Sequence, residues 1–181
     1  MEKDFPFCIC NGGETITFLG ITWREGVEAL EADIRVKPQA GPPMHIHHLQ
    51  DEIFVVETGK MAYQLGDHQT RYAFAGDTVH IPAGIPHKFW NDGKDLLICK
   101  GYVTPPGNFT FFLSELFKTI NLNKGRPGLL DGAYLFTRYR SEYAMLEIPS
   151  FVRNVVLPAV YLFGILTGKY RKYAAAPLAA R

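Results

Sequence analysis

The sequence predicts a mainly β protein in which a barrel or sandwich of short strands is followed by helices. Between residues 14 and 105, β-rich runs alternate with turn residues at intervals of about ten residues, with no helical segment between them. Beyond Pro106, apolar residues instead recur every three or four positions, as on one face of a helix. The 181 residues are 47% hydrophobic and 20% charged, which is typical of a globular chain with a sizeable core.

The expected strands follow one another without a long connection. Turn residues such as Gly12-Gly13, Gly59-Lys60, Gly76-Asp77 and Pro105-Pro106 bound them. The runs are 14–21, 29–36, 52–58, 61–65, 71–74, 78–81, 87–91 and 96–103. Residues 53–56, Ile-Phe-Val-Val, are apolar on both faces, so this strand is expected to be covered on both sides.

Three helical segments are expected after the strands. Asn108 is a candidate N-cap for a helix over 108–122. Residues 129–146 are expected to be helical in part, because Gly132 weakens the pattern. Residues 150–173 predict a second strong helix, interrupted or kinked at Pro158. We therefore divide the chain into a barrel over 1–106 and a helical extension over 107–181.

Charge separates the same two parts of the chain. Residues 1–137 carry 12 Lys and Arg against 16 Asp and Glu, whereas residues 138–181 carry 7 against 2. The net charge of the whole chain, +1, gives no general attraction to nucleic acid. Three cysteines without a CxxC pair favour reduced thiols, and the first residues lack the apolar core of a signal peptide. Both observations predict a cytoplasmic protein.

The stretch 44–52, MHIHHLQDE, concentrates three histidines and two acids. His45 and His47 are two residues apart, so on an extended strand both side chains point to one face while His48 points to the other. Together with Glu52 they form a plausible half of a metal site. The alternative is a polar strand end, and this stretch alone does not decide between the two.

A second motif lies some thirty-five residues downstream. It reads Gly76, five residues, Pro82, one residue, Gly84, two residues, His87, three residues and Asn91. This pattern matches the second signature of the cupin family at all five fixed positions. The first cupin signature then also fits, as His45-x-His47, four residues, Glu52, six residues and Gly59. One position departs: the leading glycine of the family would stand at Gln39, and the nearest glycine here is Gly41.

Over residues 30–105, with its signatures within 41–91, the chain thus resembles a single-barrel cupin of the cupin 2 type. The resemblance implies a double-stranded β-helix, or jelly-roll barrel, that holds one divalent metal. The metal ligands carried over from the family are His45, His47, Glu52 and His87. Three imidazoles and a carboxylate suit Fe, Mn, Ni, Zn or Cu, with coordination positions left for water, oxygen or substrate. His48, His68 and His80 fall outside the pattern.

Strand alternation predicts which side chains line the barrel. If Glu52 points inward, Phe54 and Val56 do too, and if His87 points inward, so does Phe89. Tyr63 is expected on the neighbouring strand. These residues, Phe54, Val56, Tyr63 and Phe89, are substrate-pocket candidates for a flat or apolar molecule. The alternative is that they are ordinary core residues.

Three function classes follow from the resemblance. The first is a metal-dependent enzyme for a small organic molecule, either an oxidoreductase of the dioxygenase type or an isomerase or lyase. The second is a noncatalytic cupin that binds a small ligand as a sensor, and the third is a structural or dimerising scaffold. The four ligands favour the first class, because a scaffold has no need to bury them.

The partners expected are a small molecule and a second copy of the chain, in a homodimer. The apolar segment within 149–173 must be covered. Packing on the barrel or on a second subunit is favoured for it over peripheral contact with a membrane.

Overall fold

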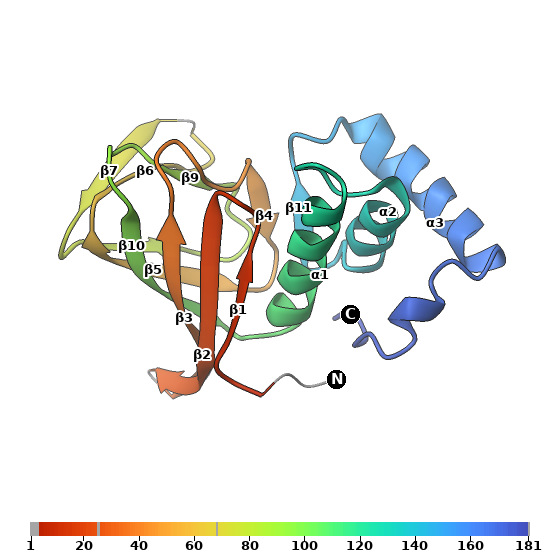
Figure 1. Ribbon diagram of the computed structural model, residues 1–181, viewed down its shortest axis with the longest axis horizontal. Coiled ribbons are helices and arrows are strands. Elements are labelled where there is room, and N and C mark those ends of the chain that lie inside the picture. The colour runs from red at the N-terminus through yellow and green to blue at the C-terminus, as the bar shows by residue number, and fades with distance from the viewer. Residues whose placement is uncertain (1–3, 25, 68, 181) are drawn as a thin grey trace.

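The computed structural model describes residues 4–24, 26–67 and 69–180. A β-barrel occupies one end of the molecule and a group of helices the other (Figure 1). The fold is the mainly β jelly roll with C-terminal helices that the sequence predicts. In the described part of the chain, the larger sheet has six strands in the order β1-β2-β3-β10-β5-β8. Their bounds are Phe7–Cys10 (β1), Glu14–Arg24 (β2), Val27–Val36 (β3), Leu97–Thr104 (β10), Asp51–Thr58 (β5) and Thr78–Ile81 (β8).

The facing side of the barrel is built from two smaller sheets. One has the order β7-β6-β9, from Thr70–Phe74 (β7), Lys60–Gln64 (β6) and Lys88–Asn91 (β9). The other pairs β4 (His45–His47) with β11 (Tyr143–Met145), in antiparallel register with Tyr143 opposite His47. A bridge between His45 and His87 joins the two. Strand β11 was not expected, because it lies where the sequence predicts partial helix.

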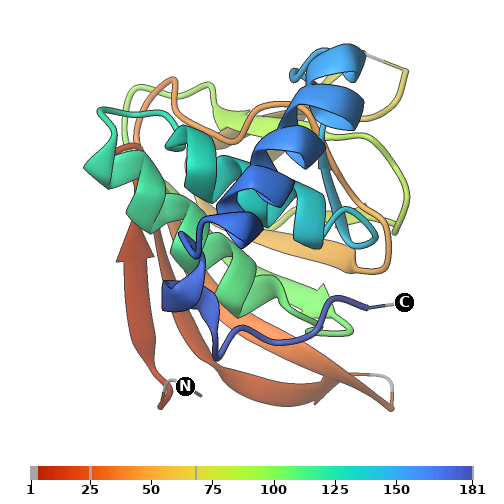
Figure 2. The same ribbon diagram turned by 90° about the vertical axis from the view of Figure 1, so that its right-hand side faces the viewer.

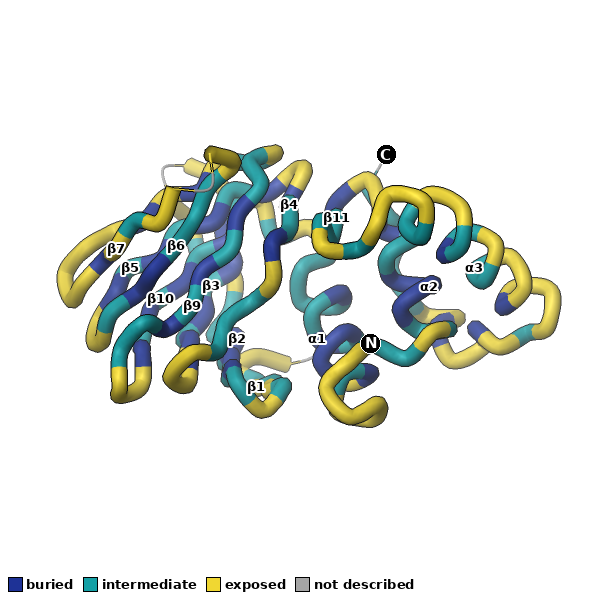
Figure 3. The backbone as a smooth tube through the Cα atoms, turned by 90° about the horizontal axis from the view of Figure 1, so that it is seen from above, coloured by how far each residue is buried: buried dark blue, intermediate teal, exposed yellow. Residues whose placement is uncertain are grey.

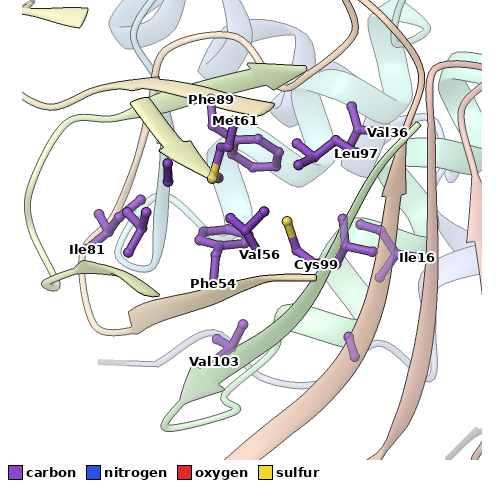
Figure 4. Close-up of a cluster of buried hydrophobic side chains, with 14 of the residues drawn as sticks. Ile16, Val36, Phe54, Val56, Met61, Ile81, Phe89, Leu97, Cys99 and Val103 are labelled. Atoms are coloured by element: carbon purple, nitrogen blue, oxygen red, sulfur yellow. The ribbon is translucent and has the colours of Figure 1, made fainter. Parts of the chain in front are cut away.

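Side chains that alternate inward along the strands fill the barrel. Glu52, Phe54 and Val56 of β5 are buried while their neighbours are less so, as the period of two requires. Figure 4 shows Phe54, Val56, Met61, Phe89 and Leu97 converging between the sheets. All five side chains are buried, so the barrel has a closely packed core below its open end.

The extension begins with α1 (Phe109–Leu122) and α2 (Leu129–Arg138). Asn108 stands at the N-cap position, but its side chain makes no capping hydrogen bond. The Nδ2 group of Asn108 instead donates to Glu142 Oε1 at 2.6 Å and to the Leu178 carbonyl at 2.8 Å. A second core joins these helices to β11, with Phe112, Leu135 and Tyr139 buried in it.

Residues 150–173 form a composite of helical turns. A π-helical turn over Val152–Val156 leads into α3 (Leu157–Leu166), and a 3₁₀ turn follows at Arg171–Tyr173. Pro158 sits in the first turn of α3, where its missing N–H is tolerated, so the irregularity precedes the proline. Figure 2 shows α3 crossing in front of α1 and α2, which separate it from the barrel. No helix in the described residues is long and apolar enough to cross a membrane.

Candidate metal centre

The four predicted ligand residues meet at the helical end of the barrel. Strand β4 supplies His45 and His47, β5 supplies Glu52, and His87 immediately precedes β9. The backbones of His45 and His87 exchange two hydrogen bonds, N to O, of 2.9 and 2.8 Å. One donor atom from each of the four residues lies within 4.8 Å of the other three. The two cupin signatures are thus joined across the barrel.

Backbone carbonyls orient two of the imidazoles. His45 donates through Nδ1 to the Pro43 carbonyl at 2.8 Å, and His87 donates through Nδ1 to the Ile85 carbonyl at 2.8 Å. For His45 this tautomer leaves the Nε2 lone pair free, which is the usual arrangement of a metal-bound histidine. His87 Nε2 lies 2.9 Å from Glu52 Oε2.

The third imidazole, that of His47, has a ring nitrogen without a hydrogen-bond partner among the described residues. His47 Nδ1 is buried and has no hydrogen-bond partner among the described residues, and it lies 3.6 Å from Glu52 Oε1. A buried polar atom without a partner is costly unless something else satisfies it.

The electrostatics keep most of the cluster in the metal-binding protonation state. Burial, together with the charges of His47 and His87, lowers the pKa of His45 to about 3. Burial also lowers the pKa of His47. Burial acts to raise the pKa of Glu52, but the three neighbouring histidines outweigh it and lower the pKa to about 2. His45 and His47 are therefore neutral and Glu52 is ionised at neutral pH.

His87 behaves differently from the other two histidines. Burial acts to lower its pKa, but the hydrogen bond and the charge of Glu52 outweigh burial and raise it. A cation at the centre of the cluster would replace this proton as the partner of Glu52, because metal ligands must be deprotonated. Three nitrogens and one carboxylate, buried and directed to one point, fit a divalent transition ion. The cluster could hold a metal, and its identity stays a prediction.

A cavity of about 410 Å³ opens beside the cluster. His45, His47 and Glu52 lie in its wall, whereas His87 lies behind them. The rest of the lining is mostly apolar. It comes from the barrel through Ile16, Leu30, Ala32, Ile34, Phe54, Phe89 and Val103, and from the extension through Phe109, Phe112, Leu113, Leu116, Phe117, Phe136 and Met145. Helix α1 thus forms the roof of a barrel that would otherwise be open.

The predicted pocket residues separate into two groups. Phe54 and Phe89 line the cavity, with ring centroids 4.9 Å apart. Val56 and Tyr63 are not among its lining residues: Val56 is buried in the barrel core and Tyr63 packs against that core. The alternation rule predicted the inward face of β5 but not how far the cavity extends along it. The paired rings of Phe54 and Phe89 form its floor.

The remaining histidines are placed away from the cluster. His48 is exposed and directly follows β4. His80 is exposed and lies 2.9 Å, Nε2 to Oδ2, from Asp51. His68 lies outside the described residues.

Sequence reasoning missed two polar residues of the cavity wall. Tyr143, on β11, is buried with its ring centroid 5.4 Å from that of His47, and its hydroxyl has no hydrogen-bond partner in the described chain. Glu14 is buried at the start of β2, and Asn11 Nδ2 donates to its Oε1 at 3.0 Å. Burial raises the pKa of Glu14. The alternation of Glu14, Ile16 and Phe18 on one face of β2 was the signal that could have revealed Glu14.

The departure from the family signature, where Gln39 stands in place of a glycine, also has a structural explanation. A Cβ atom added to Gly41 would lie 2.0 Å from the Phe89 carbonyl oxygen, so the backbone there requires glycine. Gln39, at the position where the family has glycine, adopts a φ of 62°. The close approach between the loop before β4 and strand β9 therefore takes place at Gly41.

The protonation pattern predicts that the metal-free protein loses stability on acidification. His45 takes up its proton near pH 6.5 when unfolded but only near pH 3 when folded, so its contribution is lost as pH falls between these values. Glu52 adds a loss of the same sign between pH 4.5 and 2. His87 contributes with the opposite sign: its stabilisation is present below pH 6.5 and lost as pH rises through its raised pKa.

Urea unfolding in the presence of a chelator at about pH 7 and about pH 4.5 measures this loss. We expect a decrease of a few kcal/mol in the free energy of unfolding, since each unit of pKa shift corresponds to about 1.4 kcal/mol. A His45→Asn variant, which lacks the titrating ring, should lose less. Equal losses in the two proteins would contradict the assignment of this loss to His45.

Fold and site together define a class of protein: a jelly-roll barrel with three histidines and one glutamate buried at its open end. Residues 32–99 match the family described as the cupin domain. This segment of the chain is therefore a cupin domain.

The relatives and the solved structure described next match only part of this chain. It is 36% identical over 70 residues to a protein named probable oxidoreductase virH of Hypocrea virens, covering 38% of this chain and 32% of virH. It is 38% identical over 50 residues to oxidoreductase iacF of Pestalotiopsis fici, covering 28% of this chain and 24% of iacF. The chain thus spans a third or less of these two relatives. A crystal structure of a Klebsiella pneumoniae protein with a double-stranded β-helix domain superposes with a TM-score of 0.45 at 20% identity, covering 53% of this chain and 75% of that one.

Proposed function

We propose that the protein is a metal-dependent oxidoreductase that acts on a small, largely apolar organic molecule. The observation that carries the proposal is the position of the cluster in the wall of the apolar cavity. His45, His47 and Glu52 face the cavity, so a molecule bound there lies directly against the ligand set. The names of virH and iacF, both oxidoreductases, support the reaction class.

His45, His47, Glu52 and His87 would hold the ion, which when bound supplies Lewis-acid or redox chemistry at the cavity wall. The chain itself contributes orientation and the exclusion of water. Phe54 and Phe89 form an aromatic floor, and α1 closes the roof with Phe109 and Phe112, so a flat ring fits between them. Such apolar surroundings strengthen the electrostatic interactions at the cluster.

Two further groups give the cavity polar contacts. Glu14 has one oxygen held by Asn11, while the other has no hydrogen bond among the described residues. With its pKa raised by burial, the Glu14 carboxyl can hold a proton and donate it in a hydrogen bond to a substrate oxygen. Tyr143 offers an unpaired hydroxyl next to His47. The substrate expected is an aromatic or alicyclic molecule with one or two oxygen substituents.

Oxygen consumption with a panel of such molecules tests the proposal. The protein is stripped of metal, reloaded separately with Fe, Mn, Ni, Zn or Cu in divalent form, and assayed in an oxygen electrode. We expect oxygen uptake that requires one redox-active ion and a substrate. Turnover without oxygen uptake would instead indicate an isomerase or lyase. Tight binding without any turnover would indicate a ligand-binding sensor, and both results would overturn the proposed reaction.

A further inference from the structure

Helix α3 presents an apolar face that nothing in the described chain covers. Phe151, Val155, Ala159, Leu162 and Leu166 succeed one another at spacings of three or four residues and therefore share one side of the helical segment. All five are exposed, Phe151 by 68% and Leu166 by 78%. Figure 3 shows this side of the molecule, at the far end from the barrel, as a run of exposed backbone. We call these five residues the outer face.

The opposite side of α3 packs against the rest of the extension, so the orientation of the outer face is fixed. Leu157 and Gly164 are buried, and a Cβ atom on Gly164 would lie 2.4 Å from the ring of Tyr170. Tyr170 in turn donates its hydroxyl hydrogen to the Leu130 carbonyl of α2 at 3.0 Å. The sequence favoured packing of this segment on the barrel or on a second subunit, whereas in the structure the inner side of α3 packs on α2.

The charges around the outer face are of one sign. Residues 154–168 carry no charge, and residues 148–181 contain no Asp or Glu. Arg153 precedes the uncharged stretch, and Lys169 and Arg171 follow it. Lys172 forms an ion pair with Asp131 of α2 at 2.5 Å, whereas Lys169 and Arg171 form none among the described residues.

This charge distribution argues against a second copy of the chain as the occupant. A symmetric dimer places the same surface on both sides of the interface. With two α3 helices antiparallel, Lys169 and Arg171 would approach the partner's Arg153, and with parallel helices they would approach the partner's Lys169 and Arg171. Like charges would meet in either arrangement, without an acid nearby to compensate them.

An anionic membrane surface would supply the negative charge that a second copy of the chain lacks. We propose that α3 lies in the plane of a bilayer surface, with the outer face among the lipid acyl chains and with Lys169 and Arg171 at anionic headgroups. A helix with an exposed apolar face and basic residues at its end has the features of an interfacial helix. The barrel, on the other side of α1 and α2, would remain in water (Figure 2).

Flotation with lipid vesicles tests the proposal on the full chain. Vesicles of phosphatidylcholine with about 30% phosphatidylserine are compared with vesicles of phosphatidylcholine alone. We expect flotation on the anionic vesicles, little on the neutral ones, and release as salt is raised. A Leu162→Glu, Leu166→Glu variant should bind at least about tenfold less, and a Lys169→Gln, Arg171→Gln variant should bind several-fold less.

The matched control adds the same charges to another exposed apolar pair. Tyr72 and Phe74 on β7 are 50% and 53% exposed and lie at the far end of the barrel (Figure 1). Tyr72→Glu, Phe74→Glu should float like the unchanged chain. Failure of the unchanged chain to float on anionic vesicles would overturn the proposal, as would an equal loss in this control. A dimer in sedimentation that Leu162→Glu, Leu166→Glu dissociates, without any flotation, would assign the face to a second copy.

Discussion

We expect the unchanged chain to purify with about one transition-metal ion per chain, and a protein in which His45 and His87 are both replaced by alanine to purify without it. The two residues supply half of the buried donor set, and each ring is oriented by a hydrogen bond from its Nδ1 to a backbone carbonyl. Loss of an outer-shell partner alone weakens metal binding by about 10- to 100-fold. Removal of two direct ligands should therefore exceed that effect and leave no occupancy after dialysis.

Elemental analysis of the purified proteins measures the occupancy, and circular dichroism checks the fold. The barrel should stay folded, because the paired hydrogen bonds between residues 45 and 87 use only backbone atoms. His48→Ala is the matched control, since it removes an exposed imidazole directly after the same strand, and it should bind a full complement of metal. Full occupancy in the double variant would show that the ligand assignment is wrong.

Replacement of Glu142 by alanine is expected to destabilise the protein by about 3 kcal/mol or more, because each donor left without its partner costs about 1–3 kcal/mol and three hydrogen bonds are lost. Glu142 is completely buried. Its Oε1 accepts hydrogen bonds from Asn108 Nδ2 at 2.6 Å and from the Ala180 N–H at 2.9 Å, and its Oε2 accepts one from the Asn108 N–H at 3.3 Å. Alanine would leave the N–H groups of Asn108 and Ala180 without these partners, and Asn108 Nδ2 with only the Leu178 carbonyl.

Urea unfolding monitored by near-ultraviolet circular dichroism measures the loss. Glu142→Gln keeps the shape and one acceptor oxygen, so its loss should fall between those of the unchanged chain and the alanine variant. Glu115→Ala, on an exposed side of α1 where the carboxylate meets Lys118 at 3.4 Å, should change stability by less than about 1 kcal/mol. A similar small effect for Glu142→Ala would mean that water replaces its hydrogen bonds.

The barrel and the ligand set could be predicted because their signals are local. Turn residues and alternation mark the strands, and the histidines and the glutamate stand at fixed spacings within two short motifs. Strand ends were less well defined: β2 continues to Arg24, past the predicted end at residue 21, with a register shift between Phe18 and Gly20. A bulge of this kind has no clear sequence signal.

The roof of the cavity could not be predicted because it depends on long-range pairing. Residues 143–145 are too few to show a β pattern, and they form β11 only because β4 offers them an edge. Burial of Glu14 was unforeseen for a related reason, since a carboxylate at a strand end is ordinarily solvated. Tyr143 and Glu14 both become part of the site through contacts that join distant segments of the chain.

The four clustered residues and the side chains that close the cavity come from different parts of the chain. The four ligand residues lie within residues 32–99, whereas Phe109, Phe112, Leu116 and Tyr143, which close the cavity above them, come from the extension. The four clustered residues and the roof of the cavity are therefore encoded by consecutive stretches of the chain. Substitutions in the second stretch can change the shape of the cavity while the cluster stays in place, so the two features can vary independently among related sequences.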